Sequence, residues 1–192
     1  MPTIKEGALT FEFPDSWRAT KLDDWSFYRN QFIRLGSGLR QPCGECGAEL
    51  RCQNCGKAKT QGIKAVDILA WDAAATLWLI EIKDYRGSPR TKEIELADEV
   101  ALKVRDSLAL LVAAAMSARD PGERSFARDA LTRERICIGL HLEQPKQHSK
   151  LARRAIDPVD VRQRLRQLVR SIDPHPSVFE LGMNVTAPWT VN

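Results

Sequence analysis

Two neighbouring apolar stretches within residues 64–87, KAVDILAWDAAATLWLIEIKDYRG, constrain the fold more than any other part of the chain. The pattern predicts two strands, Ile63–Trp71 and Thr76–Tyr85, separated by a short segment. If residues 72–76 form the connection, its length is one that joins antiparallel strands in a hairpin. The region is therefore expected to form a β-hairpin.

This hairpin would bring two carboxylates together. With residues 72–76 as the loop, Trp71 pairs with Leu77, and the same register continued along the strands places Asp67 opposite Glu81. Directly opposed residues have Cβ atoms about 4.5–5.5 Å apart, a distance at which two ionised carboxylates repel each other. A divalent cation would remove this repulsion, because Mg²⁺ binds one or two carboxylates together with water and phosphate oxygens. The register therefore predicts a cation site.

A lysine lies next to the two acids. Lys83 follows Glu81 by two residues and projects from the same face of the strand, beside the expected cation. There it is placed to orient or deprotonate a water molecule and to neutralise charge on a phosphate, while the cation lowers the pKa of that water. In the alternative interpretation, Glu81 and Lys83 form an ordinary ion pair at the end of a strand. The cation site is favoured because charged residues in the apolar strand LWLIEIK are costly unless they are paired or bound to metal.

An aspartate near the end of one strand, followed by Glu-Ile-Lys on the next, resembles the signature of the PD-(D/E)xK, or restriction-endonuclease-like, nuclease superfamily. Asp67 occupies the position of the first acid, and Val66 stands where the family's proline would be. The resemblance implies that Asp67, Glu81 and the carbonyl group of Ile82 bind Mg²⁺ or Mn²⁺. It also implies that Lys83 is catalytic.

The expected elements form an α/β fold in the order helix, two strands, helix, strand, helix, strand, with a mixed sheet flanked by helices. This order is similar to the α-β-β-β-α-β core of the restriction-endonuclease-like family, although the family's first strand is not obvious here. On the first helix, Asp24 or Asp23 is the candidate for a further acidic residue that the resemblance implies. Outside the hairpin we expect a short strand at residues 9–13, helices at residues 22–35, 92–117 and from Asp157 onward, and strands at residues 136–142 and 178–185.

Four of the five cysteines lie in residues 42–59, a segment with almost no apolar content that cannot fold by hydrophobic burial alone. They form two CxxC pairs, each followed by glycine, and this spacing supplies four thiolates to one tetrahedral, structural Zn²⁺. An iron–sulfur cluster or redox-active thiols are the alternatives. The fifth, Cys137, is expected in the core. The predicted zinc ligands are Cys43, Cys46, Cys52 and Cys55.

The whole chain, residues 1–192, is thus expected to be a single nuclease-like domain that carries residues 42–59 as a zinc-knuckle insertion. Its net charge of +4 permits a nucleic-acid partner but does not by itself argue for one. Related nucleases often place a polar residue near the start of the long helix, so the resemblance makes Lys92 and Lys103 candidates to face the substrate. Basic residues also gather on the last helix and its approach, where a solvated face is the commoner explanation; they are Arg153, Arg154, Arg162, Arg164, Arg166 and Arg170.

The function predicted from the sequence is metal-dependent hydrolysis of phosphodiester bonds, in DNA. The alternative is a catalytically inactive domain of the same fold that binds nucleic acid or a partner protein. A homodimer is a further possibility, because many nucleases that cut both strands work as dimers. No apolar run reaches the 18–20 residues that a membrane-spanning helix needs, and the first residues lack the features of a signal peptide. A cytoplasmic protein without a membrane partner is therefore expected.

Overall fold

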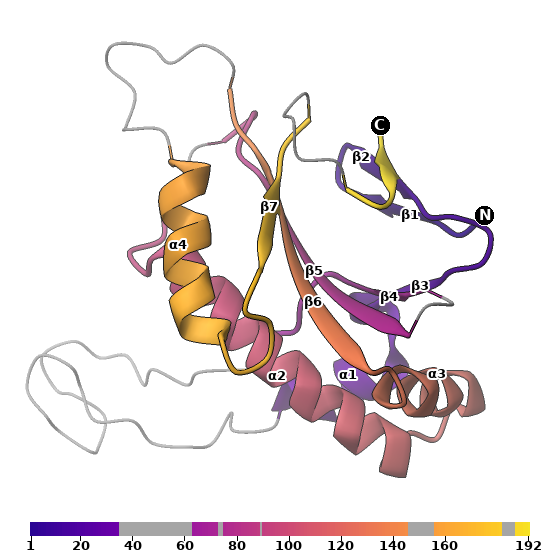
Figure 1. Ribbon diagram of the computed structural model, residues 1–192. Coiled ribbons are helices and arrows are strands. Elements are labelled where there is room, and N and C mark those ends of the chain that lie inside the picture. The colour runs from indigo at the N-terminus through magenta and orange to yellow at the C-terminus, as the bar shows by residue number, and fades with distance from the viewer. Residues whose placement is uncertain (35–62, 73–74, 89, 146–155, 182–186) are drawn as a thin grey trace, which may run out of the picture.

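The chain forms an α/β structure in which helices flank a mixed β-sheet (Figure 1). In the computed structural model, the description covers residues 1–34, 63–72, 75–88, 90–145, 156–181 and 187–192. The mixed sheet flanked by helices agrees with the fold class expected from the sequence. The predicted zinc knuckle at residues 42–59 lies outside the described residues, so the restriction-endonuclease-like core with a zinc insertion stays a prediction.

The larger sheet has five strands in the order β3-β4-β5-β6-β7. Strands β3, β4 and β5 are antiparallel to one another, whereas β5, β6 and β7 run parallel. The central strand β5 is therefore the point at which an antiparallel hairpin joins a parallel unit. The bounds of the strands are Arg18–Lys21 for β3, Ile68–Trp71 for β4, Thr76–Asp84 for β5, Arg135–Glu143 for β6 and Ser177–Phe179 for β7.

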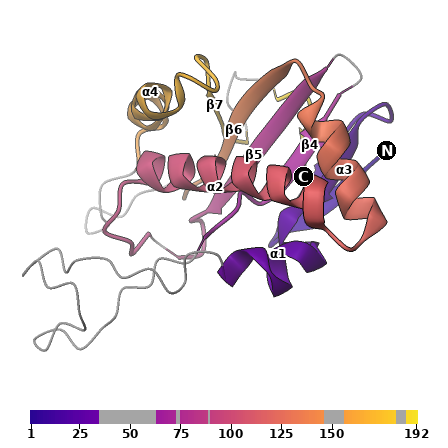
Figure 2. The same cartoon turned by 90° about the horizontal axis from the view of Figure 1, so that it is seen from below.

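Helices cover one face of this sheet, and a second sheet covers the other. Figure 2 shows α2 running across the helical face, with α1 and α3 beside it. The second sheet has three strands in the order β1-β2-β8 and packs through Leu9 and Phe11 against the opposite face. The helices are α1 at Ser26–Asn30, α2 at Leu96–Ser117, α3 at Pro121–Leu131 and α4 at Pro158–Val169, and the small strands are β1 at Thr3–Glu6, β2 at Leu9–Glu12 and β8 at Thr190–Val191.

The hairpin register expected from the sequence is confirmed. Trp71 pairs with Leu77 and Leu69 with Leu79, and all four side chains belong to the core beneath the helices. The alternate residues of β4 and β5 face the small sheet and its aromatic core instead. Because side chains on a strand alternate between faces, this register also decides which face receives the charged residues at the end of β5.

The expected helix at residues 22–35 is broken into three short pieces. They are a 3₁₀-helix at Leu22–Asp24, the single α-helical turn of α1, and a second 3₁₀-helix at Phe32–Arg34. The break falls at Trp25, whose backbone is extended and whose indole donates a hydrogen bond to the Thr20 hydroxyl. A distant carboxylate, that of Glu123 in α3, then accepts hydrogen bonds from the first backbone N–H groups of α1. Tertiary contacts therefore override the local helical periodicity.

Helix α3 is absent from the elements expected from the sequence, because Asp120-Pro121-Gly122 is composed of residues typical of a turn. In the structure, Asp120 is the N-cap: its carboxylate accepts a hydrogen bond from the backbone N–H of Glu123. Proline at the first helical position follows the cap, an arrangement that favours helix initiation. The last helix begins with the same Asp-Pro pair, and Asp157 caps α4 at the start that was expected from the sequence.

Among the described residues, no helix is both long enough and apolar enough to cross a membrane.

Candidate functional site

Three of the predicted site residues meet where β4 begins and β5 ends, on the face that α2 covers. Asp67 directly precedes β4, and Glu81 and Lys83 lie in β5. The Oδ2 atom of Asp67 accepts a hydrogen bond from the backbone N–H of Ile82 at 2.7 Å, which anchors the carboxylate across the hairpin. The structure therefore brings Asp67, Glu81 and Lys83 into one cluster.

An ammonium group from α2 joins the two carboxylates. Lys103 Nζ lies 2.6 Å from Glu81 Oε1 and 3.5 Å from Asp67 Oδ1. The repulsion expected between the two acids is thus relieved, among the described residues, by a lysine that contacts both. The sequence placed Lys103 near a substrate, but it did not indicate this bridging position.

Lys83 also contacts two carboxylates. Lys83 Nζ lies 2.7 Å from Glu81 Oε1 and 3.4 Å from Glu99 Oε1. Glu99 belongs to α2 and forms further ion pairs with Arg90 and Lys92. Sequence reasoning missed Glu99, although it precedes Lys103 by four residues and therefore occupies the same face of the helix one turn earlier.

Burial strongly perturbs Glu81. Its side chain is 0% exposed. Desolvation, reinforced by the negative charge of Asp67, raises the pKa of Glu81 from 4.5 to about 7, although Lys103 and Lys83 oppose the shift. The Oε2 atom has no hydrogen-bond partner among the described residues. Because buried polar atoms are normally satisfied, this oxygen is a position where a cation, a proton or a water molecule would bind.

Lys83 and Glu99, which pair with each other beside Glu81, are both charged at neutral pH. Burial alone would lower the pKa of Lys83, but the charge and hydrogen bond of Glu81, with the charge of Glu99, outweigh it and raise that pKa. Burial alone would raise the pKa of Glu99, but hydrogen bonds from Lys92 and Arg90 outweigh it and lower that pKa to about 2. Lys83 is therefore protonated, and Glu99 ionised, throughout the physiological pH range.

The donor set fits a hard divalent cation in part. Asp67 and Glu81 supply two carboxylates, the number that Mg²⁺ commonly takes from a protein, and one buried oxygen has no partner. Within the described ranges there is no cluster of three or more His, Cys, Asp or Glu side chains that could hold a metal. A cation at this position would therefore complete its shell with the Ile82 carbonyl group, water or phosphate, and it would compete with the Lys103 ammonium.

Asp24 lies elsewhere. Its carboxylate forms an ion pair with Arg29 at 2.8 Å, and both side chains are exposed. In the part of the chain that the structure describes, no hydrogen bond or ion pair links Asp24 to Asp67 or Glu81. The short 3₁₀-helix that carries Asp24 turns it toward solvent, so the structure does not place this predicted residue in the cluster.

A second buried titratable pair lies on the opposite face of the sheet, near the end of β6. His141 is buried, and its Nε2 atom lies 2.9 Å from Glu143 Oε1. Burial lowers the pKa of His141. The sequence assigned no role to this histidine. On the same strand, Cys137 is half-buried rather than fully in the core, and burial raises the pKa of its thiol.

No protein-family model matches the chain, and no solved structure matches it. A curated relative is the protein named cysteine–tRNA ligase from Neisseria meningitidis serogroup A / serotype 4A, which is 37% identical over 159 residues. The match covers 79% of this chain but 22% of the relative, so the chain spans about a fifth of the length of that protein. The relative is named as a ligase that acts on tRNA.

This relationship contradicts the predicted nuclease. The relative's name denotes the joining of cysteine to tRNA, and it supports neither a phosphodiesterase nor an endonuclease of the restriction type. The structure bears on one role that was predicted for Lys83, the deprotonation of a water molecule. A general base must be able to lose its proton near neutral pH, whereas the raised pKa of Lys83 keeps this lysine protonated between Glu81 and Glu99.

Proposed function

We propose that this chain is an RNA-binding domain that serves tRNA aminoacylation, and that the cluster around Glu81 contacts an RNA phosphate without hydrolysing it. One observation carries the proposal: Asp67, Glu81, Lys83 and Lys103 converge in a half-buried cluster in which one carboxylate oxygen of Glu81 has no partner. The relative named for tRNA makes RNA the nucleic acid to test, in place of DNA.

The charges of the cluster suit a phosphate. Among the described residues, four cationic side chains lie against three carboxylates, and these seven groups together carry a net positive charge even when Glu81 is ionised. The side chain of Lys92 is 46% exposed, so a phosphate group can approach the cluster from solvent on this side. Because Coulomb attraction is stronger where water is excluded, the excess positive charge of this partly desolvated group would attract a phosphate more strongly than the same charge in water. The carboxylates are Asp67, Glu81 and Glu99, and the cations are Lys83, Lys92, Lys103 and Arg90.

A divalent cation would strengthen this contact. We place Mg²⁺ or Mn²⁺ at the carboxylates of Asp67 and Glu81 and the carbonyl group of Ile82, where it would neutralise charge between the acids and the RNA phosphate. Asp67 is oriented for this role by the hydrogen bond that it accepts from the Ile82 backbone. Lys103 would hold the two carboxylates together when the cation is not bound.

The family resemblance and the zinc knuckle belong to the same proposal. A helix-flanked hairpin with Asp67 on one strand and Glu81 and Lys83 on the next supports a core of the PD-(D/E)xK type that is used here for binding. The cysteine pairs at residues 42–59 would hold a structural zinc ion, and their spacing supports this assignment. With Lys83 fixed as a cation, such a core positions phosphate rather than activating water.

The test is binding of the whole chain to a fluorescein-labelled transcript of a cysteine tRNA, measured by anisotropy with Mg²⁺ and with EDTA. We expect binding in both conditions and tighter binding with Mg²⁺. Asp67→Asn keeps an oxygen that accepts the Ile82 hydrogen bond but removes the charge, so Mg²⁺ should no longer tighten binding. Asp24→Asn is the matched control, because it removes the same charge outside the cluster, and it should behave as the unchanged chain does.

Two results would overturn the proposal. One is the absence of binding to the transcript at any Mg²⁺ concentration. The other is the appearance of shortened RNA on a denaturing gel after incubation with Mg²⁺ or Mn²⁺, provided that Asp67→Asn abolishes the cleavage. An Mg²⁺ effect that is retained equally in Asp67→Asn and Asp24→Asn would show that the cation acts on the RNA rather than on the cluster.

A further inference from the structure

We propose that the outer face of α4 is a second RNA contact, at which Arg162, Arg166 and Arg170 bind successive backbone phosphates. This inference rests on the proposed function and adds a surface that lies apart from the Glu81 cluster. We call these three residues the arginine stripe.

The stripe follows from the way α4 is attached to the core. Val161, Leu165 and Val169 recur every four residues and are buried against the body of the protein. Each arginine of the stripe follows one of these residues directly and is exposed. Because residues four apart on a helix lie one above the other, the three guanidinium groups form a row with a rise of about 6 Å per step.

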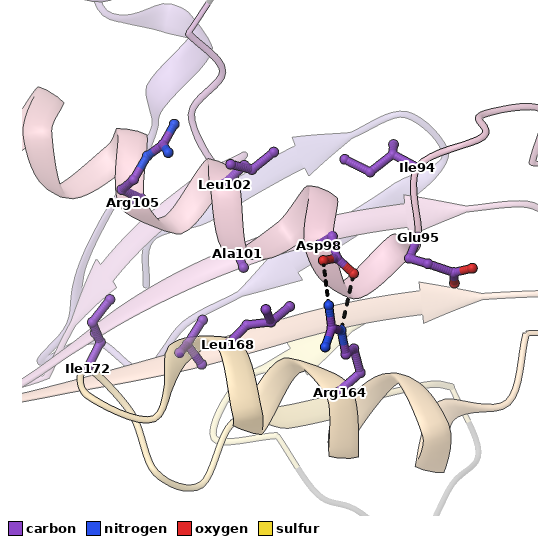
Figure 3. A pocket seen from close by; sticks show the side chains of 10 residues that line it. Ile94, Glu95, Asp98, Ala101, Leu102, Arg105, Arg164, Leu168 and Ile172 are labelled. Atoms are coloured by element: carbon purple, nitrogen blue, oxygen red, sulfur yellow. Dashed lines mark hydrogen bonds and ion pairs between the residues drawn. The ribbon is translucent and has the colours of Figure 1, made fainter. Parts of the chain in front are cut away.

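Arg164, the remaining arginine of α4, has a structural role. Arg164 turns toward α2, and Figure 3 shows its guanidinium group bridged to both carboxylate oxygens of Asp98 across the groove between the two helices. Among the described residues, the arginine stripe forms no ion pair and donates no side-chain hydrogen bond. Three cations along one face therefore repel each other, and no carboxylate of the residues that the structure describes forms an ion pair with them.

The helix dipole explains only part of this pattern. Basic residues in the last turn of a helix interact favourably with its negative end, and this accounts for Arg166 and Arg170. Arg162 is the fifth residue of α4, outside the last turn, so the dipole does not favour a cation there, and it still faces solvent in the same row. An anionic partner that extends along the whole row accounts for all three positions.

The chemistry of the row selects an RNA backbone as that partner. Guanidinium groups bind phosphate oxygens in a bidentate manner, and a step of one helical turn is comparable to the step between neighbouring phosphates of one strand. The exposed Gln163 and Gln167 lie beside the row and can donate to sugar and phosphate oxygens. A membrane surface fits less well, because a helix that lies on a membrane needs a free apolar face, and Val161, Leu165 and Val169 of α4 are buried against the protein.

The test compares two variants that lose the same charge. One replaces Arg162, Arg166 and Arg170 with glutamine, and the control replaces Lys5, Arg119 and Arg124, cations outside α4 that form no ion pair in the described part of the chain. Each phosphate contact contributes about 0.7–0.9 to the slope of log K against log salt concentration, so losing three should reduce the slope by about two to three. At 0.15 M salt this corresponds to a loss of affinity for the tRNA transcript on the order of 100-fold.

The control variant should retain nearly the original salt slope, and far-UV circular dichroism should show that both variants keep their helices. If the stripe variant and the control show the same slope and affinity, the stripe does not bind RNA, and the inference is overturned while the proposed function stands. If the unchanged chain does not bind the transcript at all, both fail. Loss of binding to anionic phospholipid vesicles with unchanged RNA binding would assign the stripe to a membrane and would also overturn the inference.

Discussion

Replacing Glu81 with glutamine should make the protein more stable at alkaline pH while leaving its stability nearly unchanged at acidic pH. Glutamine has almost the same shape as a protonated glutamate, so the substitution mimics the neutral form of this fully buried side chain. In the unchanged protein, burial raises the pKa of Glu81 from 4.5 to about 7. The folded state therefore holds this proton more tightly than the unfolded state does.

The sign and size of the effect follow from that difference. Between pH 4.5 and pH 7 the unfolded chain has lost the Glu81 proton and the folded protein has kept it, so rising pH favours unfolding. The free energy of unfolding falls by about 1.4 kcal/mol for each pH unit in this window, and by about 3 kcal/mol over the whole window. Above pH 7 the difference levels off. Lys83 has a raised pKa and does not titrate in this range, so it contributes nothing to the slope.

The assay is urea unfolding of both proteins between pH 5 and pH 8.5 in the presence of EDTA, with the free energy of unfolding compared at each pH. His141 titrates in both proteins, so its contribution cancels in the difference. We expect Glu81→Gln to gain stability relative to the unchanged chain as pH rises, and to keep a constant advantage above pH 7. A difference that is flat across this range, or that favours glutamate at pH 8, would refute the idea that a desolvated carboxylate lies at the centre of the cluster.

Three further changes probe the fold and the zinc knuckle. Leu165→Ala should lower the free energy of unfolding by about 2–5 kcal/mol, because Leu165 is fully buried beneath α4. Leu168 is 37% exposed in the groove, so Leu168→Ala should lower the free energy of unfolding far less in the same urea titration. Gly139→Ala should destabilise by about 1 kcal/mol and alter tryptophan fluorescence, since the new Cβ would lie 3.1 Å from Phe179 and 3.4 Å from Trp189; unchanged stability would show that both rings move freely. Cys46→Ser should abolish the zinc measured by atomic absorption, and retention of full zinc content would remove this cysteine from the proposed ligand set.

Much of the hairpin could be predicted from the sequence. The apolar stretches, the short connection and the alternation of side chains determine the register of β4 and β5, and the pairs Trp71–Leu77 and Leu69–Leu79 follow from them. The start of α4 could also be predicted from local sequence, because Asp157 and Pro158 form a cap that involves only neighbouring residues. Such features need no information from distant parts of the chain.

Other elements depended on contacts that no local pattern contains. The first helix is interrupted because Glu123, almost a hundred residues away in the chain, binds the N–H groups at the start of α1. The small strands β1 and β8 exist because they pair with β2, one on each side. In a short strand most of the stabilisation comes from its neighbours, so the sequence of the strand carries little of the signal.

The same division applies to the site. The sequence by itself determined that Asp67, Glu81 and Lys83 share one face of a hairpin, because alternation and register are local properties. Only the tertiary structure decided their chemistry: α2 brought Lys103 against both acids and Glu99 against Lys83, and it removed Glu81 from water. Desolvation and charge pairing depend on every group packed around an atom, and for that reason the residues of the site were predictable while its protonation state and reaction were not.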